Sequence, residues 1–159
     1  MAPRHPTPEV VGWREWVGLP SLNVPWIKAK IDTGAQTSSL HAFGLREFRR
    51  EGEAWVRFVV HPWQASARDG VRVELPVYDR RRVRSSTGHA QSRVVVLADL
   101  RMHGRTIPIE VTLTRRDSMG FRMLVGREAL SNGFLVDPSE SYLGGKPPSR
   151  VRRANRLEL

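Results

Sequence analysis

Apolar residues in this chain come in short runs, and glycine, proline, asparagine or aspartate separates each run from the next. No window keeps the apolar period of a long amphipathic helix. The run before Asp32 alternates cleanly, because lysines separate Ile27, Ala29 and Ile31. In a strand, this pattern places the apolar side chains on one face and the lysines on the other. The sequence therefore predicts an all-β fold.

Other apolar runs extend this interpretation along the chain. Met102-His103-Gly104-Arg105 lies between two long runs, which favours a β-hairpin. Residues 127–130 suit one short helix towards the C-terminus, and Asn132-Gly133 ends it. The strands that we expect are 10–17, 26–31, 54–60, 71–77, 93–100, 106–113, 123–125 and 134–136.

The chain has 159 residues, which suits one domain whose core is large enough to fold without disulfide bonds or a structural metal ion. We place this domain at 9–143, between a disordered N-terminal segment, 1–8, and a flexible basic tail, 144–159. The formal net charge is +10, and the tail holds +4 of it because its five basic residues stand against Glu158. Such an excess favours an anionic partner, although a basic tail can also serve solubility alone.

The composition excludes several classes of function. There is no cysteine, so disulfides, thiolate catalysis and cysteine-bound metal clusters are ruled out. The opening residues are polar and proline-rich, and no apolar run approaches the length that spans a bilayer. We therefore expect a cytoplasmic protein with no membrane partner.

Asp32-Thr33-Gly34 follows the alternating run directly. An aspartate on a tight turn after a buried strand is held in position and partly shielded from water. Gly34 allows backbone amides to approach closely, while Thr33, Ser38 and Ser39 can fix the turn by hydrogen bonds. An ordinary Asx turn at a strand end explains the triplet equally well when it is taken alone, so its context decides.

Two later segments supply that context. Met123-Leu124-Val125-Gly126-Arg127 is a short apolar strand that ends in Gly-Arg and leads into the expected helix. Between it and the Asp32 turn lies the polar stretch 85–92, which strand-like arms flank. Together the three elements resemble the signature of retropepsin-type aspartic peptidases. In that group the Gly-Arg strand lies beside the catalytic turn, and a hairpin flap closes over the substrate.

Within that group, the sequence resembles bacterial retropepsin-like proteins that are often labelled ATP-dependent zinc proteases. These proteins are associated with an ATP-grasp ligase that adds glutamates to a ribosomal protein. The resemblance covers 11–143 and implies a retropepsin-like closed β-barrel. The segments that carry it are 32–42, 86–88, 112–119, 123–127 and 134–138.

The residues themselves favour neither zinc nor ATP. The five histidines are scattered, without the His-Glu-x-x-His spacing of common zinc peptidases. No Gly-x-x-x-x-Gly-Lys-Ser/Thr loop is present to bind ATP phosphates. We therefore expect an enzyme without a metal ion or another cofactor.

Aspartic peptidases need two neighbouring carboxylates that share one proton. One carboxylate takes a proton from the attacking water while the other, protonated, polarises the scissile carbonyl. This chain has a single Asp-Thr-Gly, so a twofold homodimer that pairs Asp32 with its copy is the natural solution. The catalytic residues that we expect are Asp32, Thr33 and Gly34.

The resemblance also indicates which residues bind substrate. Viral retropepsins commonly carry an aspartate that pairs with the arginine of Gly-Arg, whereas this chain has Gln36, which leaves Arg127 without that partner. Arginines at 80–84, 93 and 115–116 favour an acidic peptide, such as the poly-glutamate tail of a protein; for 80–84 a solvated basic loop is the alternative. The expected substrate-binding residues are Ala35, Gln36, Arg82, Arg84, Ser86, Thr87, Gly88, His89, Arg93 and Arg127.

Two other functions stay open. The first is a retropepsin-fold module of little or no activity that binds acidic tails or the ribosome surface. The second is a nucleic-acid binder, which the basic tail and five tryptophans suggest. However, the tryptophans fall mostly within strand-like runs, where core packing explains them, and no nucleic-acid-binding motif is present. We therefore do not expect a nucleic-acid partner.

Overall fold

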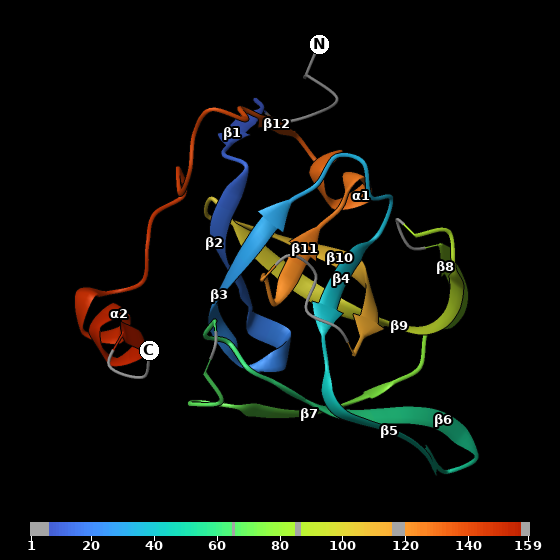
Figure 1. Cartoon of the computed structure of the whole chain (residues 1–159). Helices are drawn as coiled ribbons and strands as arrows, with labels where there is room; N and C mark the ends of the chain where they lie inside the picture. The colour runs from blue at the N-terminus through green and yellow to red at the C-terminus, as the bar shows by residue number, and fades with distance from the viewer. Residues whose placement is uncertain (1–6, 65, 85–86, 116–119, 157–159) are drawn as a thin grey trace.

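The computed structural model describes residues 7–64, 66–84, 87–115 and 120–156. Strands dominate these residues, as the sequence predicts (Figure 1). The strands are β1 Glu9–Val11, β2 Arg14–Leu19, β3 Val24–Ile31, β4 Ser38–His41, β5 Phe43–Arg50, β6 Glu53–Val60, β7 Val71–Pro76, β8 Asp79–Arg84, β9 Ala90–Met102, β10 Arg105–Thr114, β11 Met123–Val125 and β12 Phe134–Val136. The helices are the 3-10 turn η1 Pro20–Leu22, α1 Arg127–Leu130 and α2 Ser149–Arg156.

Six of the strands form a closed ring. In order around the ring they are β10, β4, β11, β3, β2 and β9, and the antiparallel pairing of β9 with β10 closes it. β8 lies outside the ring as the second arm of an antiparallel hairpin with β9. The predicted barrel is therefore confirmed. Of the polar stretch 85–92, residues 85 and 86 lie outside the described residues, and residues 90–92 are the start of β9.

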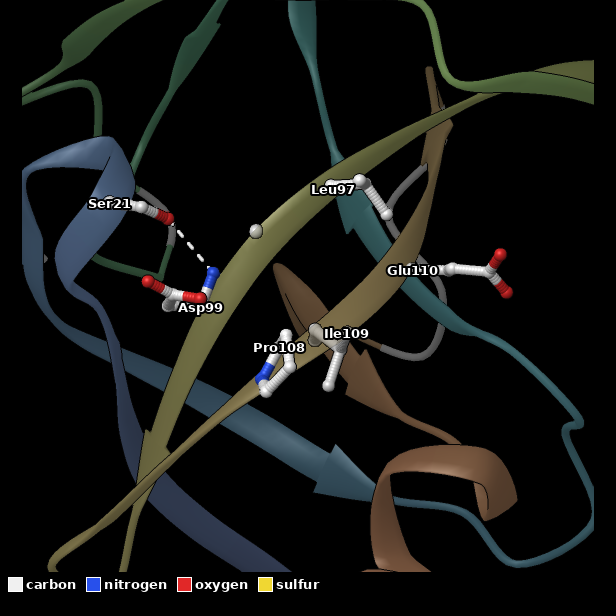
Figure 2. A pocket seen from close by; sticks show the side chains of 7 residues that line it. Ser21, Leu97, Asp99, Pro108, Ile109 and Glu110 are labelled. Atoms are coloured by element: carbon white, nitrogen blue, oxygen red, sulfur yellow. Dashed lines mark hydrogen bonds between the residues drawn. The ribbon is translucent and has the colours of Figure 1, made fainter.

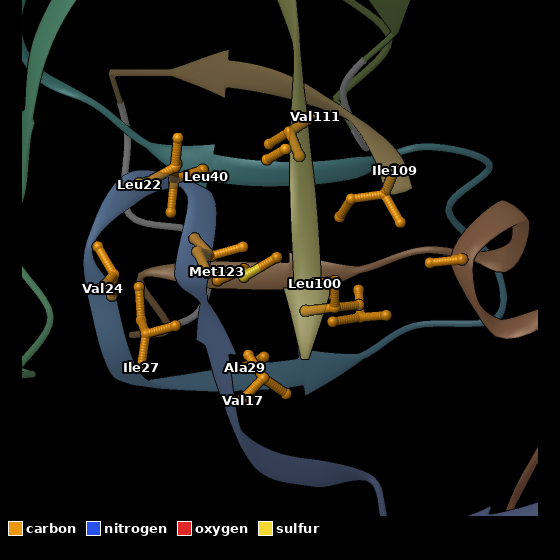
Figure 3. Close-up of a cluster of buried hydrophobic side chains, with 14 of the residues drawn as sticks. Val17, Leu22, Val24, Ile27, Ala29, Leu40, Leu100, Ile109, Val111 and Met123 are labelled. Atoms are coloured by element: carbon orange, nitrogen blue, oxygen red, sulfur yellow. The ribbon is translucent and has the colours of Figure 1, made fainter. Parts of the chain in front are cut away.

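The alternating run before Asp32 forms β3, whose apolar face lies in the core (Figure 3). Ile27 and Ala29 are fully buried, and Leu100 and Met123 belong to the same cluster. The lysines of β3 are only half-buried. Each large apolar side chain contributes about 1.5–3 kcal/mol when it leaves water, so the alternation that identifies β3 also holds it in the barrel.

β11 is only three residues long, yet it lies between two strands of the ring. It runs parallel to β3, with Val125 opposite Ile31, and antiparallel to β4, with Met123 opposite Leu40. Both neighbours bind its backbone, and its side chains at Met123 and Val125 are buried. The chain therefore leaves β11 directly beside the end of β3, where the Asp32 turn begins.

Residues 10–17, predicted as one strand, belong to two strands with different partners. β1 pairs in parallel with β12, whereas β2 joins the barrel. The break falls at Gly12, where a Cβ atom would lie 2.3 Å from the carbonyl oxygen of Glu140, because the returning C-terminal segment crosses here. The fully buried carboxylate of Glu15 holds that segment by accepting hydrogen bonds from two of its backbone amides at 2.9 Å.

Several further elements are absent from the sequence prediction, among them β4, β5, β8 and α2. β5, with β6 and β7, forms a three-stranded sheet beside the ring; its residues are mostly exposed, so it lacks the apolar alternation that marks a strand. The segment 144–159, expected to be a flexible basic tail, contains helix α2, which the sequence does not predict. Within the described residues, no helix combines the length and the apolar character needed to cross a membrane.

Candidate active site

Asp32 begins the turn that follows β3, and backbone contacts orient its side chain. The Asp32 amide donates to the Val125 carbonyl at 2.9 Å, which ties the turn to β11. The Gly34 amide donates to Asp32 Oδ1 at 2.9 Å, and the Ala35 amide donates to the Asp32 carbonyl at 3.3 Å. Asp32 Oδ2 has no hydrogen-bond partner among the described residues. The Asx turn that the sequence allows is therefore present, and it fixes one carboxylate oxygen while leaving the other available.

Three small residues of the turn have different roles. A Cβ atom on Gly34 would lie 3.2 Å from Asp32 Oδ1, so a side chain there would press on the oriented carboxylate. Ser38 Oγ accepts a hydrogen bond from the buried Gly126 amide at 3.1 Å, as the sequence predicts for this serine. The hydroxyl of Thr33, predicted to fix the turn, makes no hydrogen bond to any described residue.

Gly126 packs directly against the Asp32 turn. A Cβ atom there would lie 2.7 Å from the carbonyl carbon of Thr37 and 2.9 Å from the carbonyl oxygen of Ala35. Both are backbone atoms that cannot rotate away. The φ angle of Gly126 is −94°, which any residue can adopt. Close packing against the turn, rather than backbone conformation, therefore explains the glycine of Gly-Arg.

The first amides of α1 bind the same turn. The Arg127 amide donates to the Ala35 carbonyl at 2.6 Å, and the Glu128 amide donates to the Gln36 carbonyl at 3.0 Å. Amides at a helix start have no partner within the helix, so the turn caps α1. Gln36 Nε2 also donates to Glu128 Oε1 at 3.0 Å. Residues 32–38 and 123–130 thus form one hydrogen-bonded body, which we call the Asp32 unit.

Within the described chain, Arg127 has no carboxylate partner beside the turn, as expected from Gln36 standing where viral retropepsins commonly have an aspartate. Arg127 is exposed and pairs with no carboxylate among the described residues; its Nη1 donates only a long hydrogen bond, 3.5 Å, to the Thr33 carbonyl. Gln36 instead uses Glu128 as its partner. The sequence analysis does not single out Glu128, and its position next to Arg127 is the one signal that points to it.

The predicted substrate-binding residues of the hairpin do not contact Asp32 through a hydrogen bond or an ion pair within the described part of the chain. Ser86 lies outside the described residues. Arg93 is half-buried and stands opposite Arg81 in the hairpin register. The other predicted substrate-binding residues of the hairpin are exposed to solvent: Arg82, Arg84, Thr87, Gly88 and His89.

The arginine-rich segment before the hairpin loop is strand β8 and not a loop, and Arg82 and Arg84 on it are exposed to solvent. That they bind substrate stays a prediction. Arg80 binds Glu47, and Arg81 binds both Asp79 and Glu110. The hydrogen bonds from Arg81 to Glu110 and then to Asp79 raise the pKa of its guanidinium. The other two arginines of β8 pair with no acid among the described residues.

Two hollows on the barrel surface do not include Asp32. One, about 330 Å³ in volume, lies across β9 and β10, where the Asp99 amide donates to Ser21 Oγ (Figure 2). The other, about 180 Å³, lies between β10 and α1. The Asp32 turn itself is exposed at Thr33 and Gly34, so one chain does not enclose its own aspartate.

The fold and the site together define a class of protein. A closed barrel carries one Asp-Thr-Gly turn at the end of a core strand, and a Gly-Arg strand is bonded beside it. A hairpin projects from the same ring. This is the retropepsin-like fold of aspartic peptidases. No group of three or more histidine, aspartate or glutamate side chains in the described residues is placed to hold a metal ion.

Comparison with protein families leads to the same class and makes it specific. The family described as RimB-like, retropepsin-like aspartic endopeptidase RimB, matches residues 10–147. This match covers most of the chain. The chain therefore belongs to the RimB-like family.

Individual proteins that are similar to this chain include named ligases and one solved structure. Proteins named probable alpha-L-glutamate ligase are similar to it: that of Shewanella pealeana is 50% identical over 86% of this chain, and that of Desulfotalea psychrophila is 44% identical over 82%. The chain spans only 30% and 28% of the length of these two relatives. A solved structure of a Legionella pneumophila protein of unknown function matches with a TM-score of 0.69 and 26% identity, over 85% of this chain and 97% of that one.

Proposed function

We propose that the chain is an aspartic peptidase that acts as a homodimer on acidic, glutamate-rich peptides, including poly-glutamate tails of proteins. The Asp32 turn carries the proposal. Its carboxylate is oriented through Oδ1, its Oδ2 has no partner among the described residues, and the turn is exposed. A second copy of the same turn completes such a half-site. The cytoplasm is the compartment that we propose, because a chain without cysteine suits a reducing environment.

The mechanism requires the two Asp32 carboxylates to lie close together. Both cannot ionise at such a separation, so the pair holds one proton between them. The ionised carboxylate takes a proton from a water molecule, whose oxygen attacks the scissile carbonyl carbon. The protonated carboxyl donates a hydrogen bond to the carbonyl oxygen. Transfer of a proton to the leaving amine then breaks the C–N bond and restores the singly protonated pair.

The remaining residues of the turn position Asp32 and shape the cleft. Gly34 supplies the amide that orients the carboxylate. Ala35 and Gln36 already use their carbonyls to cap α1, so in this proposal they form the cleft wall rather than bind substrate through those groups. Thr33, at the exposed tip, is free to meet the second copy, because its hydroxyl has no partner among the described residues.

The sheet of β1 and β12 supports the homodimer. Val10 and Leu135 are register partners in it, and they remain 44% and 58% exposed, respectively. The sheet has only two strands within the described chain. Unpaired strand edges and exposed apolar side chains favour pairing with another chain. A second copy is the partner that also completes the Asp32 site.

Three observations support an acidic substrate. The net charge is +10. Arg82 and Arg84 on the hairpin, and Arg127 beside the turn, pair with no carboxylate among the described residues. Relatives named probable alpha-L-glutamate ligase contain a region similar to this chain. In this proposal, the ligase named in those relatives and the peptidase proposed for this chain act on the same glutamate-containing product.

The Asp32→Asn variant tests the proposal. Asparagine keeps an oxygen for the Gly34 amide, so the fold is expected to stay intact. The purified protein is incubated with an oligoglutamate peptide, and the products are measured by mass spectrometry. We expect the wild type to cleave the peptide and the variant to lose about a thousandfold or more of that activity.

The matched control is Asp99→Asn, which makes the same chemical change on β9, in the hollow of Figure 2. We expect this control to cleave like the wild type. Hydrolysis retained by Asp32→Asn would contradict the assignment. Saturable binding of a peptide that the wild type never cleaves would favour the non-catalytic binding module instead.

A further inference from the structure

A cavity of about 640 Å³ opens at the base of the β8–β9 hairpin. Residues of β5, β8, β9 and the end of β10 line it, and Asp32 is not among them. The cavity therefore lies outside the Asp32 unit. Its charged lining consists of Glu47, Arg80, Arg93 and Arg115.

The charges of this cavity are unbalanced. Three arginines face a single glutamate, so the lining has two positive charges in excess. The hydrogen bond from Arg80 lowers the pKa of Glu47, and the positive charges of Arg80 and Arg115 lower it further. One carboxylate is thus already stabilised within this cluster of guanidinium groups. The excess charge leaves capacity for a second carboxylate.

Arg93 carries a donor that the described chain does not satisfy. Its Nε is buried and has no hydrogen-bond partner among the described residues. Burial also lowers the pKa of the Arg93 guanidinium, because the loss of hydration disfavours its charged form. A buried donor without a partner costs about 1–3 kcal/mol. Such a donor in the wall of a polar cavity points to a ligand that binds there.

We propose that this cavity binds the side-chain carboxylate of an acidic peptide at a site separate from Asp32, with Arg93 and Arg115 as the donors. Guanidinium groups bind carboxylates with paired, charge-assisted hydrogen bonds. The proposal rests on the proposed function for the identity of the ligand. A peptide that binds at both Asp32 and this cavity gains affinity from the link between its two contacts.

Binding is measured by isothermal titration calorimetry with hexaglutamate, in the Asp32→Asn variant so that no turnover occurs. Arg93→Met keeps the length of the side chain and removes its donors and charge. We expect Arg93→Met to weaken binding about tenfold, as one charge-assisted hydrogen bond contributes. Arg115→Met, at an exposed position, is expected to weaken it similarly, and it stands in for Arg93→Met if that variant unfolds in circular dichroism.

The matched control is Arg72→Met, which removes the same charge from an exposed position on β7. Weakening by less than about twofold in the control, against tenfold in the cavity variants, supports the cavity. Equal weakening in all variants would overturn it, because charge alone then explains the binding. Inorganic phosphate is titrated in parallel. Binding of phosphate that depends on Arg93 and excludes hexaglutamate would overturn the carboxylate assignment.

The experiments distinguish a failure of the proposed peptidase activity from a failure of the proposed carboxylate site. If the wild type hydrolyses oligoglutamate while the cavity variants bind it normally, the cavity is wrong and the peptidase stands. If the cavity variants lose binding while the wild type never hydrolyses the peptide, the carboxylate site stands and the peptidase is wrong.

Discussion

The Asp32 unit and the β8–β9 hairpin are held in place by different kinds of contact. In the Asp32 unit, backbone amides and carbonyls bind one another, and Gly126 packs against backbone atoms of the turn. In the hairpin, the backbone of β8 pairs with β9 alone among the described strands. Ion pairs of partly exposed side chains, Arg80 with Glu47 and Arg81 with Glu110, join β8 to β5 and β10. Backbone contacts cannot rearrange without moving the chain, whereas exposed ion pairs exchange readily with water or a ligand.

This contrast separates two tasks. A pair of carboxylates that shares a proton needs fixed geometry, and the Asp32 unit is built to supply it. A surface that accepts acidic chains of varying sequence benefits from arginines that can change partners. The two kinds of contact imply different costs in the free energy of unfolding. Substitutions in the Asp32 unit should destabilise the fold more than a substitution in the ion pairs of β8.

The largest effect is expected from Gly126→Ala. The new methyl group would meet the Thr37 and Ala35 backbone at less than 3.0 Å, and neither can yield without moving the turn. We expect a loss of about 3 kcal/mol or more in the free energy of unfolding, measured with denaturant.

Gly52→Ala is the control for that prediction. Gly52 has a φ of 80° and no atom within 4 Å of a built Cβ, so only the left-handed backbone is strained, at about 1–2 kcal/mol. A cost at Gly126 equal to that at Gly52 would show that the close approach is not what fixes the turn.

A smaller loss is expected from Ser38→Ala. The Ser38 hydroxyl accepts a hydrogen bond from the buried Gly126 amide, and that amide would be left without a partner. We expect about 1–3 kcal/mol of destabilisation. Ser21→Ala is the control, because the Ser21 hydroxyl accepts from the exposed Asp99 amide, which water can satisfy instead. Equal effects at the two serines would contradict the distinction between buried and exposed contacts.

The smallest effect is expected at the hairpin, from Glu47→Gln. The pKa of Glu47 is lowered from 4.5, chiefly by the hydrogen bond from Arg80. A carboxylate with a lowered pKa stabilises the fold above its unfolded pKa, and the contribution disappears as pH falls through the folded pKa. Because the pair is exposed, the loss at neutral pH is about 0.5 kcal/mol.

That loss should vanish when the comparison is repeated below pH 4.5, through the range where Glu47 takes up its proton. Glu51→Gln, which breaks no ion pair among the described residues, is the control at neutral pH, and we expect it to cost less than Glu47→Gln. A loss of several kcal/mol for Glu47→Gln would mean that the hairpin is held as rigidly as the Asp32 unit.

Local patterns in the sequence were sufficient to predict the parts of the fold that depend on them. The alternation of Ile27, Ala29 and Ile31 identifies β3, and the run at 123–125 identifies β11. The Asp-Thr-Gly turn and the Gly-Arg segment were placed together by resemblance. The structure shows the physical reason, which is the packing of Gly126 on the turn and the capping of α1.

The features of the fold and the site that the sequence does not predict depend on contacts between residues far apart in the chain. The break after Val11 comes from the crossing of Gly12 by Glu140, which no local pattern reveals. The bond between Gln36 and Glu128 joins residues 92 positions apart. β5 carries mostly exposed residues and pairs with β6, so its strand character depends on its neighbour. Which arginines of the hairpin are paired also depends on distant acids such as Glu110.

Mixing of subunits tests the shared pair of aspartates most directly. Wild-type chains are held at constant concentration, Asp32→Asn chains are added until exchange is complete, and oligoglutamate hydrolysis per wild-type chain is measured. If each active site needs one Asp32 from each of two copies, hydrolysis per wild-type chain falls in proportion to the fraction of wild-type chains. Hydrolysis per wild-type chain that stays constant at every ratio would show that one chain acts alone.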